Sequence, residues 1–180
     1  RLPVTAQAVR NGLALVALPG RFQMVPGQPA LVLDVAHNPH AVAALVANLD
    51  AMPYYPVTHM VFGAMADKDI GDMLQRLHPV VDKWYFCDLP TPRAASNADL
   101  LQQWQQYCAG QPRIVPSEAS QHASPRAALQ AAIAAADPAD RIVVSGSFFT
   151  VGDVLSEPLP KLSAPHMPGS PDSGNPPPAA

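Results

Sequence analysis

Four short apolar segments alternate with stretches of helical spacing, and this alternation restricts the chain to few folds. The apolar segments, rich in β-branched or aromatic side chains, are 30–35, 57–62, 83–87 and 141–144. Strands that are buried on both faces of a sheet have this composition. The stretches with helical spacing are 39–52, 70–77, 97–107 and 124–136. The order predicts an α/β fold with an open, mostly parallel sheet, helices on both faces and right-handed crossovers.

Two further short segments extend the predicted sheet to about five or six strands. Residues 22–25 follow an N-terminal helical stretch and predict an edge strand, and residues 113–115 predict another short strand. Asn38 and Ser124 each precede a proline that fits a first helical turn, so both are predicted helix caps.

Length and composition predict one folded domain followed by a tail. The chain has 180 residues, of which 48% are hydrophobic, enough for one well-packed core. After Glu157, prolines alternate with Ser, Gly and Ala. Such a segment buries too little apolar surface to offset its ordering entropy. We therefore predict a folded domain over residues 1–156 and a disordered tail over 157–180.

Charge and cysteine content exclude several classes of partner. The formal net charge is -3 without a Lys/Arg cluster, which argues against nucleic-acid binding. Cys87 and Cys108 are far apart and lack metal-ligand spacing, so neither a disulfide framework nor a zinc site is predicted. No apolar run approaches the ~20 residues that span a bilayer. We expect a cytoplasmic protein that binds no membrane, and the opening residues, which lack a starting Met, are expected to be internal.

The loop after the first apolar strand carries a carboxylate and an imidazole where ligands are expected. In open parallel sheets, ligands bind at the carboxyl ends of the strands. Asp34 could accept hydrogen bonds from two vicinal hydroxyls of a ribose, and His37 could donate one to an anion. The alternative is that Asp34 and Asn38 only cap the next helix while His37 packs.

Three more segments place polar groups at the same edge of the sheet. Lys68 could pair with a carboxylate or phosphate, or could lie in a solvated turn where Asp69 caps a helix. Ser145 and Ser147 surround a glycine at the start of a helix and suit a carboxylate, although capping explains them equally well. Arg21, beside a Pro-Gly turn, could bind phosphate or remain solvated.

Known nucleotide-binding loops are missing from the sequence. It contains neither G-x-x-x-x-G-K-[ST] nor G-x-G-x-x-G. The chain therefore has no evident means of holding a nucleotide alone, and any phosphate chemistry requires another domain.

In this order, four segments resemble the C-terminal domain of the bifunctional dihydrofolate synthase/folylpolyglutamate synthase family, which is related to the Mur ligases. The segments are Leu18-Pro-Gly-Arg-Phe22, Asp34-Val-Ala-His-Asn-Pro39, Asp67-Lys-Asp69 and Ser145-Gly-Ser147. The resemblance covers about residues 5–155, and D-V-A-H-N-P-H-A is its most specific part. It implies a Rossmann-like domain, joined in the whole enzyme to an N-terminal domain whose P-loop binds ATP and Mg2+.

The resemblance also implies roles for the residues of these segments. Arg21 would contact ATP phosphates, Asp34 the ribose, and His37 and Asn38 the same nucleotide pocket; Arg21 and His37 are the candidate catalytic residues. The residues that would hold glutamate carboxylates are Lys68, Ser147 and, as a further candidate, Ser145. No metal ligand is assigned to this chain.

The implied function is ATP-dependent addition of L-glutamate to dihydropteroate and folates. A substrate carboxylate would attack ATP to give an acyl phosphate, which the glutamate amine would then displace. The chain alone is expected to be inactive, and the whole enzyme is expected to be a monomer. Two alternatives remain at this stage: a Mur-type peptidoglycan ligase domain with a UDP-linked acceptor, and a free-standing α/β module that binds an anion or a partner protein without chemistry.

Overall fold

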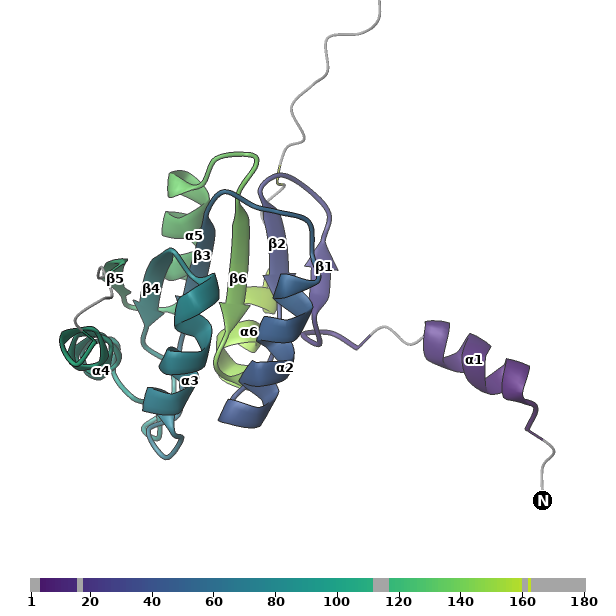
Figure 1. Ribbon diagram of the computed structural model, residues 1–180, viewed down its shortest axis with the longest axis horizontal. Coiled ribbons are helices and arrows are strands. Elements are labelled where there is room, and N and C mark those ends of the chain that lie inside the picture. The colour runs from purple at the N-terminus through teal and green to yellow at the C-terminus, as the bar shows by residue number, and fades with distance from the viewer. Residues whose placement is uncertain (1–3, 16–17, 112–116, 160–161, 163–180) are drawn as a thin grey trace, which may run out of the picture.

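The described part of the chain folds into one six-stranded sheet with helices on both faces (Figure 1). The computed structural model describes residues 4–15, 18–111, 117–159 and 162. In chain order the elements are α1 (Ala6–Leu15), β1 (Gln23–Val25), β2 (Ala30–Leu33), α2 (Pro39–Asp50), β3 (Thr58–Phe62), α3 (Ile70–Leu77), a short 3-10 helix (His78–Val80), β4 (Lys83–Cys87), α4 (Asn97–Ala109), β5 (Glu118–His122), α5 (Pro125–Ala135), β6 (Arg141–Ser145) and α6 (Phe148–Leu155).

The strand order confirms the predicted open, mostly parallel α/β fold. It runs β1-β2-β6-β3-β4-β5, with β1 antiparallel to β2 and the other pairs parallel. In β6, Val144 pairs with Leu33 of β2, and Ser145 pairs with Phe62 of β3. The carboxyl ends of the three central strands therefore lie side by side, and the loops that follow them share one edge of the sheet.

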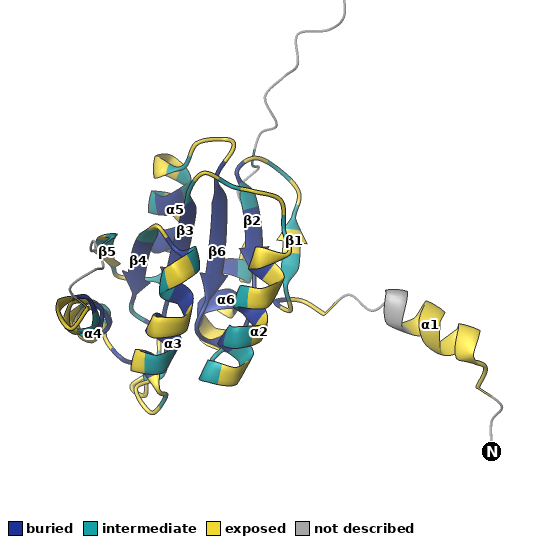
Figure 2. Ribbon diagram, viewed as in Figure 1, coloured by how far each residue is buried: buried dark blue, intermediate teal, exposed yellow. Residues whose placement is uncertain are grey.

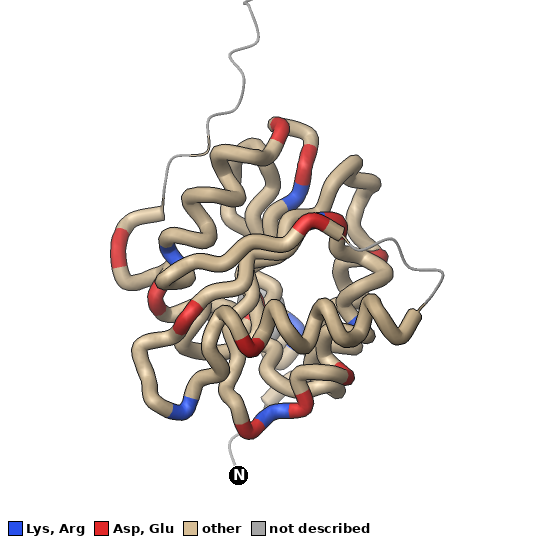
Figure 3. The backbone as a smooth tube through the Cα atoms, turned by 90° about the vertical axis from the view of Figure 1, so that its left-hand side faces the viewer, with Lys and Arg blue, Asp and Glu red and all other residues tan. Residues whose placement is uncertain are grey.

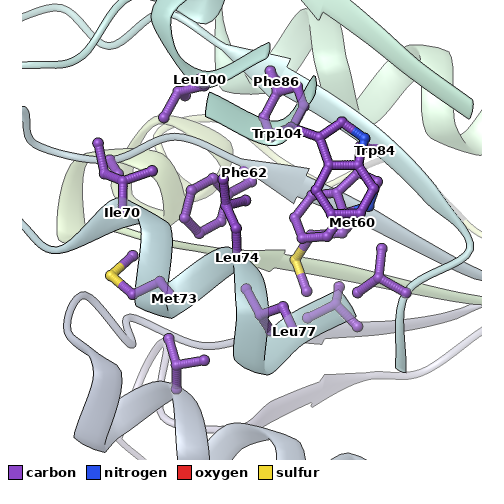
Figure 4. Packing of buried hydrophobic residues seen from close by; sticks show 14 of the residues in the cluster. Met60, Phe62, Ile70, Met73, Leu74, Leu77, Trp84, Phe86, Leu100 and Trp104 are labelled. Atoms are coloured by element: carbon purple, nitrogen blue, oxygen red, sulfur yellow. The ribbon is translucent and has the colours of Figure 1, made fainter. Parts of the chain in front are cut away.

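Alternate residues of each central strand enter two separate hydrophobic layers. Met60 and Phe62 of β3 pack with α2, α3 and α4, whereas Val61 packs with α5 and α6. Figure 4 shows the first layer, where Trp84 of β4 lies 4.9 Å from Trp104 of α4 between ring centroids. The inner strands β3, β4 and β6 are mostly dark blue in Figure 2 because both of their faces are covered. This burial explains their nearly continuous hydrophobic sequence.

Several predicted elements and caps agree with the structure. Helix α3 and strand β4 have the predicted bounds, and β1 is the predicted edge strand. The Asn38 side chain accepts from the Ala41 N–H, and the Ser124 side chain accepts from the Ala127 N–H. Both predicted caps are therefore confirmed.

Strand β5 was not predicted. The predicted strand at residues 113–115 lies outside the described residues. The strand that pairs with β4 is Glu118–His122, with Lys83 opposite Glu118. Its sequence, EASQH, contains no apolar run, and two of its five residues are exposed. An edge strand needs to cover less apolar surface than a central one, which explains why the hydrophobic pattern did not reveal it.

Packing of the described residues continues past the predicted domain end at residue 156. Leu159 and Leu162 pack against the layer that holds α5 and α6, and Arg126 pairs with Glu157 at 3.1 Å. At the other end, helix α1 matches the helical stretch expected before Leu18, and the residues described for burial in 4–12 are exposed (Figure 2). Most of the predicted tail lies outside the described residues.

Candidate active site

Asp34 connects the loop after β2 to the turn that carries Arg21. Its Oδ2 accepts a hydrogen bond from the Phe22 N–H, and its Oδ1 accepts one from the Ala36 N–H, both at 2.8 Å. Each carboxylate oxygen can accept more than one hydrogen bond, so both retain capacity for a ligand hydroxyl. Asp34 therefore shapes the site through backbone contacts and remains chemically suited to bind a ribose.

The turn around Arg21 has an unusual backbone. Gly20 has φ of 70° and Phe22 has φ of 44°. The Val35 N–H donates to the Gly20 carbonyl at 2.7 Å, which together with Asp34 fixes the turn against the end of β2. The exposed Arg21 guanidinium lies 5.6 Å from the centroid of the Phe148 ring at the start of α6. A guanidinium from the turn before β1 thus reaches the first residue of α6.

One ring nitrogen of His37 forms a hydrogen bond with the backbone. Its Nδ1 lies 2.9 Å from the Val35 carbonyl oxygen. Because a carbonyl oxygen only accepts, Nδ1 carries the proton, and Nε2 can donate to an anion only when the ring is positively charged. The ring centroid is 5.4 Å from that of Phe148. His37 and Arg21 therefore meet on the same aromatic side chain.

Asn38 and Ser147 both cap helices, as the alternative interpretation of each segment predicted. Asn38 Oδ1 accepts from the Ala41 N–H at 2.9 Å, which leaves its amide nitrogen as the donor for a ligand. Ser147 Oγ accepts from the Phe149 N–H at 3.1 Å and keeps its hydroxyl hydrogen as a donor. Ser147 is only 3% exposed, so its hydroxyl is held in a defined direction.

Lys68 shares a carboxylate with Arg93, a residue that the sequence interpretation missed. Lys68 Nζ lies 3.1 Å from Asp67 Oδ2, and Arg93 Nη2 lies 3.6 Å from the same oxygen. The hydrogen bond from Lys68, with smaller contributions from the nearby charges, lowers the pKa of the Asp67 carboxyl, which therefore stays ionised. Asp69 caps α3 by accepting from the Asp72 N–H, as its alternative interpretation predicted.

These side chains surround a cavity of about 180 Å³ at the carboxyl edge of the sheet. Its lining residues are His37, Met65, Lys68, Arg93, Ser147, Phe148 and Phe149. The volume is below the range for drug-sized ligands and suits a smaller molecule. Along the described backbone, basic and acidic positions are interspersed (Figure 3). The described lining of this cavity, in contrast, has two basic side chains, Lys68 and Arg93, and no carboxylate.

The structure brings three of the predicted site residues to the cavity and places the others around it. His37, Lys68 and Ser147 line the cavity, and Arg21 reaches its Phe148 wall. Ser145 is different: it is fully buried, and its hydroxyl donates to the Ala36 carbonyl at 3.4 Å. This hydrogen bond joins the end of β6 to the loop after β2.

Met65, Phe148, Phe149 and Arg93 are the lining residues that the sequence interpretation did not single out. The two phenylalanines directly follow Ser147 and are about half exposed. A pair of exposed aromatic residues at the start of a helix that follows a buried strand is a usable signal for a ligand site. Arg93 lies in a loop with no recognisable motif, so only the tertiary structure identifies it.

A family model described as Mur ligase, glutamate ligase domain, matches residues 20–148. The chain belongs to this family. The dihydrofolate synthase/folylpolyglutamate synthase of Escherichia coli strain K12 is 39% identical over 154 residues, which are 86% of this chain and 34% of that protein. The glutamate ligase domain described here thus spans about a third of the length of that relative.

Two solved structures resemble this glutamate ligase domain in both sequence and fold. E. coli FolC in complex with DHPP and ADP has a TM-score of 0.76 and 37% identity, over 86% of this chain and 34% of that chain. A bifunctional folylpolyglutamate synthase/dihydrofolate synthase with Mn, AMPPNP and L-glutamate bound has a TM-score of 0.72 and 38% identity, over 86% and 35%. Residues 20–148, which the family model matches, include all the predicted site residues and Arg93.

The described residues of this glutamate ligase domain offer neither a metal site nor a reactive thiol. They contain no group of three or more His, Cys, Asp or Glu side chains that could hold a metal ion. Cys87 and Cys108 are free and buried, and burial raises the pKa of both thiols. No described helix combines the length and apolar character needed to cross a bilayer.

Proposed function

We propose that this chain is the C-terminal domain of an ATP-dependent ligase that joins L-glutamate to dihydropteroate and to folates. The observation that carries the proposal is the small cationic cavity with a buried hydroxyl, next to the turns of Arg21 and Asp34. The names and bound ligands of the similar proteins favour a folate acceptor over a peptidoglycan precursor.

In the proposed reaction, a substrate carboxylate attacks the terminal phosphorus of ATP, forming an acyl phosphate and releasing ADP. The glutamate amine then attacks the acyl carbon, phosphate leaves, and the nitrogen loses a proton as the amide forms. The work of the protein is positioning and charge stabilisation. Arg21 would offset charge on the phosphate oxygens, and Lys68 with Ser147 would align the amine by holding a carboxylate of glutamate.

The residues that we assign to the nucleotide pocket offer the hydrogen-bond donors and acceptors that ATP needs. Asp34 offers acceptors for ribose hydroxyls, the Asn38 amide nitrogen is a donor, and charged His37 would donate to an anion from Nε2. Mg2+ would neutralise phosphate charge when bound. We assign the Mg2+ site to an N-terminal P-loop domain of the same protein, as the family resemblance implies. We assign the enzyme to the cytoplasm, where free thiols such as Cys87 persist.

Phosphate release by the full-length gene product tests this function. With ATP and Mg2+, release is expected only when dihydropteroate and L-glutamate are both present, and this chain alone is expected to release none. Release with a UDP-linked muramoyl acceptor instead of dihydropteroate would identify a peptidoglycan ligase. Absence of release with either acceptor would favour a binding module.

Replacing Lys68 by alanine is expected to raise the KM for L-glutamate about 10- to 100-fold, because the charged hydrogen bond to a carboxylate is lost. The KM for ATP should stay nearly unchanged. Lys83→Ala is a matched control, because Lys83 is 34% exposed against 33% for Lys68 and is also paired with a carboxylate. Steady-state kinetics of the full-length enzyme measure both constants. An equal rise in the two KM values would remove Lys68 from the glutamate site.

A further inference from the structure

Arg93 places a second cation beside Lys68 at the wall of the cavity. Both side chains line the cavity, and both contact the same oxygen of Asp67, at 3.1 Å for Lys68 Nζ and 3.6 Å for Arg93 Nη2. The two nitrogens can be no farther apart than the sum of these distances. One carboxylate thus lies between two basic side chains, which leaves an excess of positive charge at the cavity.

The backbone holds these two cations in a fixed relation. The loop after β4 carries Arg93, and the loop after β3 carries Lys68. The Ala66 N–H donates to the Arg93 carbonyl at 2.9 Å, the Ala95 N–H donates to the Ala64 carbonyl at 3.0 Å, and an isolated antiparallel bridge joins the same two loops. The loops therefore form one hydrogen-bonded unit, so the position of Arg93 relative to Lys68 does not depend on the ion pair.

The ion pair itself contributes little to folding. The Arg93 side chain is 74% exposed and that of Asp67 is 50% exposed. Exposed pairs of this kind add little to stability because water screens both charges. Arg93 can therefore turn from Asp67 to a bound anion without loss of the fold.

The proposed reaction presents an amino acid with two carboxylates. Glutamate carries its α-carboxylate on the carbon that bears the reacting amine, and its side-chain carboxylate is separated from the first by three carbon atoms. Only the amine reacts, so both carboxylates stay charged through the reaction. The amine must approach the nucleotide, which places the α-carboxylate near His37 and the less exposed cation, Lys68. The side-chain carboxylate then extends toward the exposed rim.

We propose that Arg93 is the specificity-determining residue that binds the side-chain carboxylate of the incoming glutamate, while Lys68 holds the α-carboxylate. This inference rests on the proposed function. A guanidinium donates through a planar fork that matches a carboxylate, whereas an amide lacks the negative charge that makes this pairing strong. Arg93 therefore selects dicarboxylic amino acids over their uncharged analogues.

The test compares L-glutamate with L-glutamine, which has nearly the same shape and no side-chain charge, in the full-length enzyme with saturating ATP and dihydropteroate. Arg93→Gln is expected to lower kcat/KM for glutamate about 10- to 100-fold and to leave kcat/KM for glutamine unchanged. Lys68→Ala should lower both values by similar factors. Arg76→Gln is the matched control, since Arg76 is also an exposed arginine paired with an aspartate, Asp72.

The outcomes separate the inference from the function on which it rests. A glutamate-to-glutamine selectivity ratio that Arg93→Gln leaves within twofold of wild type would overturn the role of Arg93, whether or not total activity falls. Urea unfolding of the same variant is expected to match wild type, which excludes a general loss of fold. If the wild-type enzyme shows no glutamate-dependent phosphate release, the proposed function itself fails.

Discussion

Replacing Arg21 by alanine in the full-length enzyme is expected to lower kcat/KM for ATP about 100- to 1000-fold, the usual effect of removing one preorganised donor to a developing negative charge. The stability of the domain should change by less than about 1 kcal/mol, because an exposed cation over an aromatic ring contributes no more than that. Arg21 is exposed and lies over Phe148. Phosphate-release kinetics and urea unfolding measure the two effects separately.

Two further substitutions make this result interpretable. Arg10→Ala removes an exposed arginine from α1 and should leave activity unchanged. Arg21→Lys keeps the charge but loses the planar fork of donors, so we expect an intermediate rate. Near-native turnover of Arg21→Ala would show that Arg21 does not act on the phosphates.

The position of the Arg21 turn could be predicted from the sequence, but the contact that holds the turn in place could not. The residues themselves predicted that Arg21 and Asp34 lie at the same edge of the sheet, since Asp34 follows a buried strand. They did not predict the hydrogen bond from the Phe22 N–H to Asp34, which joins residues that are 12 positions apart. Phe22 has positive φ in this turn, and nothing in a phenylalanine indicates such a backbone conformation.

The elements that could be predicted are the buried ones, because their residues are nearly all apolar. Strand β4 is nearly continuous in apolar and aromatic residues and lies between two helical layers, so its bounds followed from hydrophobicity alone. Strand β5 is a partly exposed edge and follows no such pattern. Its position depends on pairing with β4, a long-range property that a single segment does not encode.

The cavity was only partly predictable for a similar reason. His37, Lys68 and Ser147 belong to loops whose place is set by the ends of the predicted strands. Arg93 reaches the cavity because the loop after β4 is hydrogen-bonded to the loop after β3. Strand order determines which loops are neighbours, but contacts between their side chains depend on loop conformation, which composition does not determine.

Replacing Gly146 by alanine is expected to destabilise this domain by about 3 kcal/mol. This value combines the strain of a side chain at positive φ with the cost of overpacking. Gly146 has φ of 105°, and an added Cβ would lie 2.5 Å from the Gly63 carbonyl oxygen and 2.9 Å from the Phe62 ring. The Gly146 N–H also donates to the Ala36 carbonyl at 3.0 Å, so the strain would reach the loop that carries His37. Urea unfolding should show the lower free energy of unfolding, and thermal unfolding should show a fall in Tm of roughly 6–12 °C.

Gly152→Ala is the control, because it adds the same methyl group to the same part of the chain. Gly152 lies inside α6, and its added Cβ would meet nothing within 4 Å. There alanine should stabilise the helix by up to about 1 kcal/mol. The two substitutions would then change the free energy of unfolding in opposite directions, because the two glycines differ in backbone conformation and in the space around the added Cβ. If Gly146→Ala instead unfolded at the wild-type urea concentration, the loops after β3 and β6 would have room to separate, and the cavity that they help to position would be less rigid than its hydrogen bonds indicate.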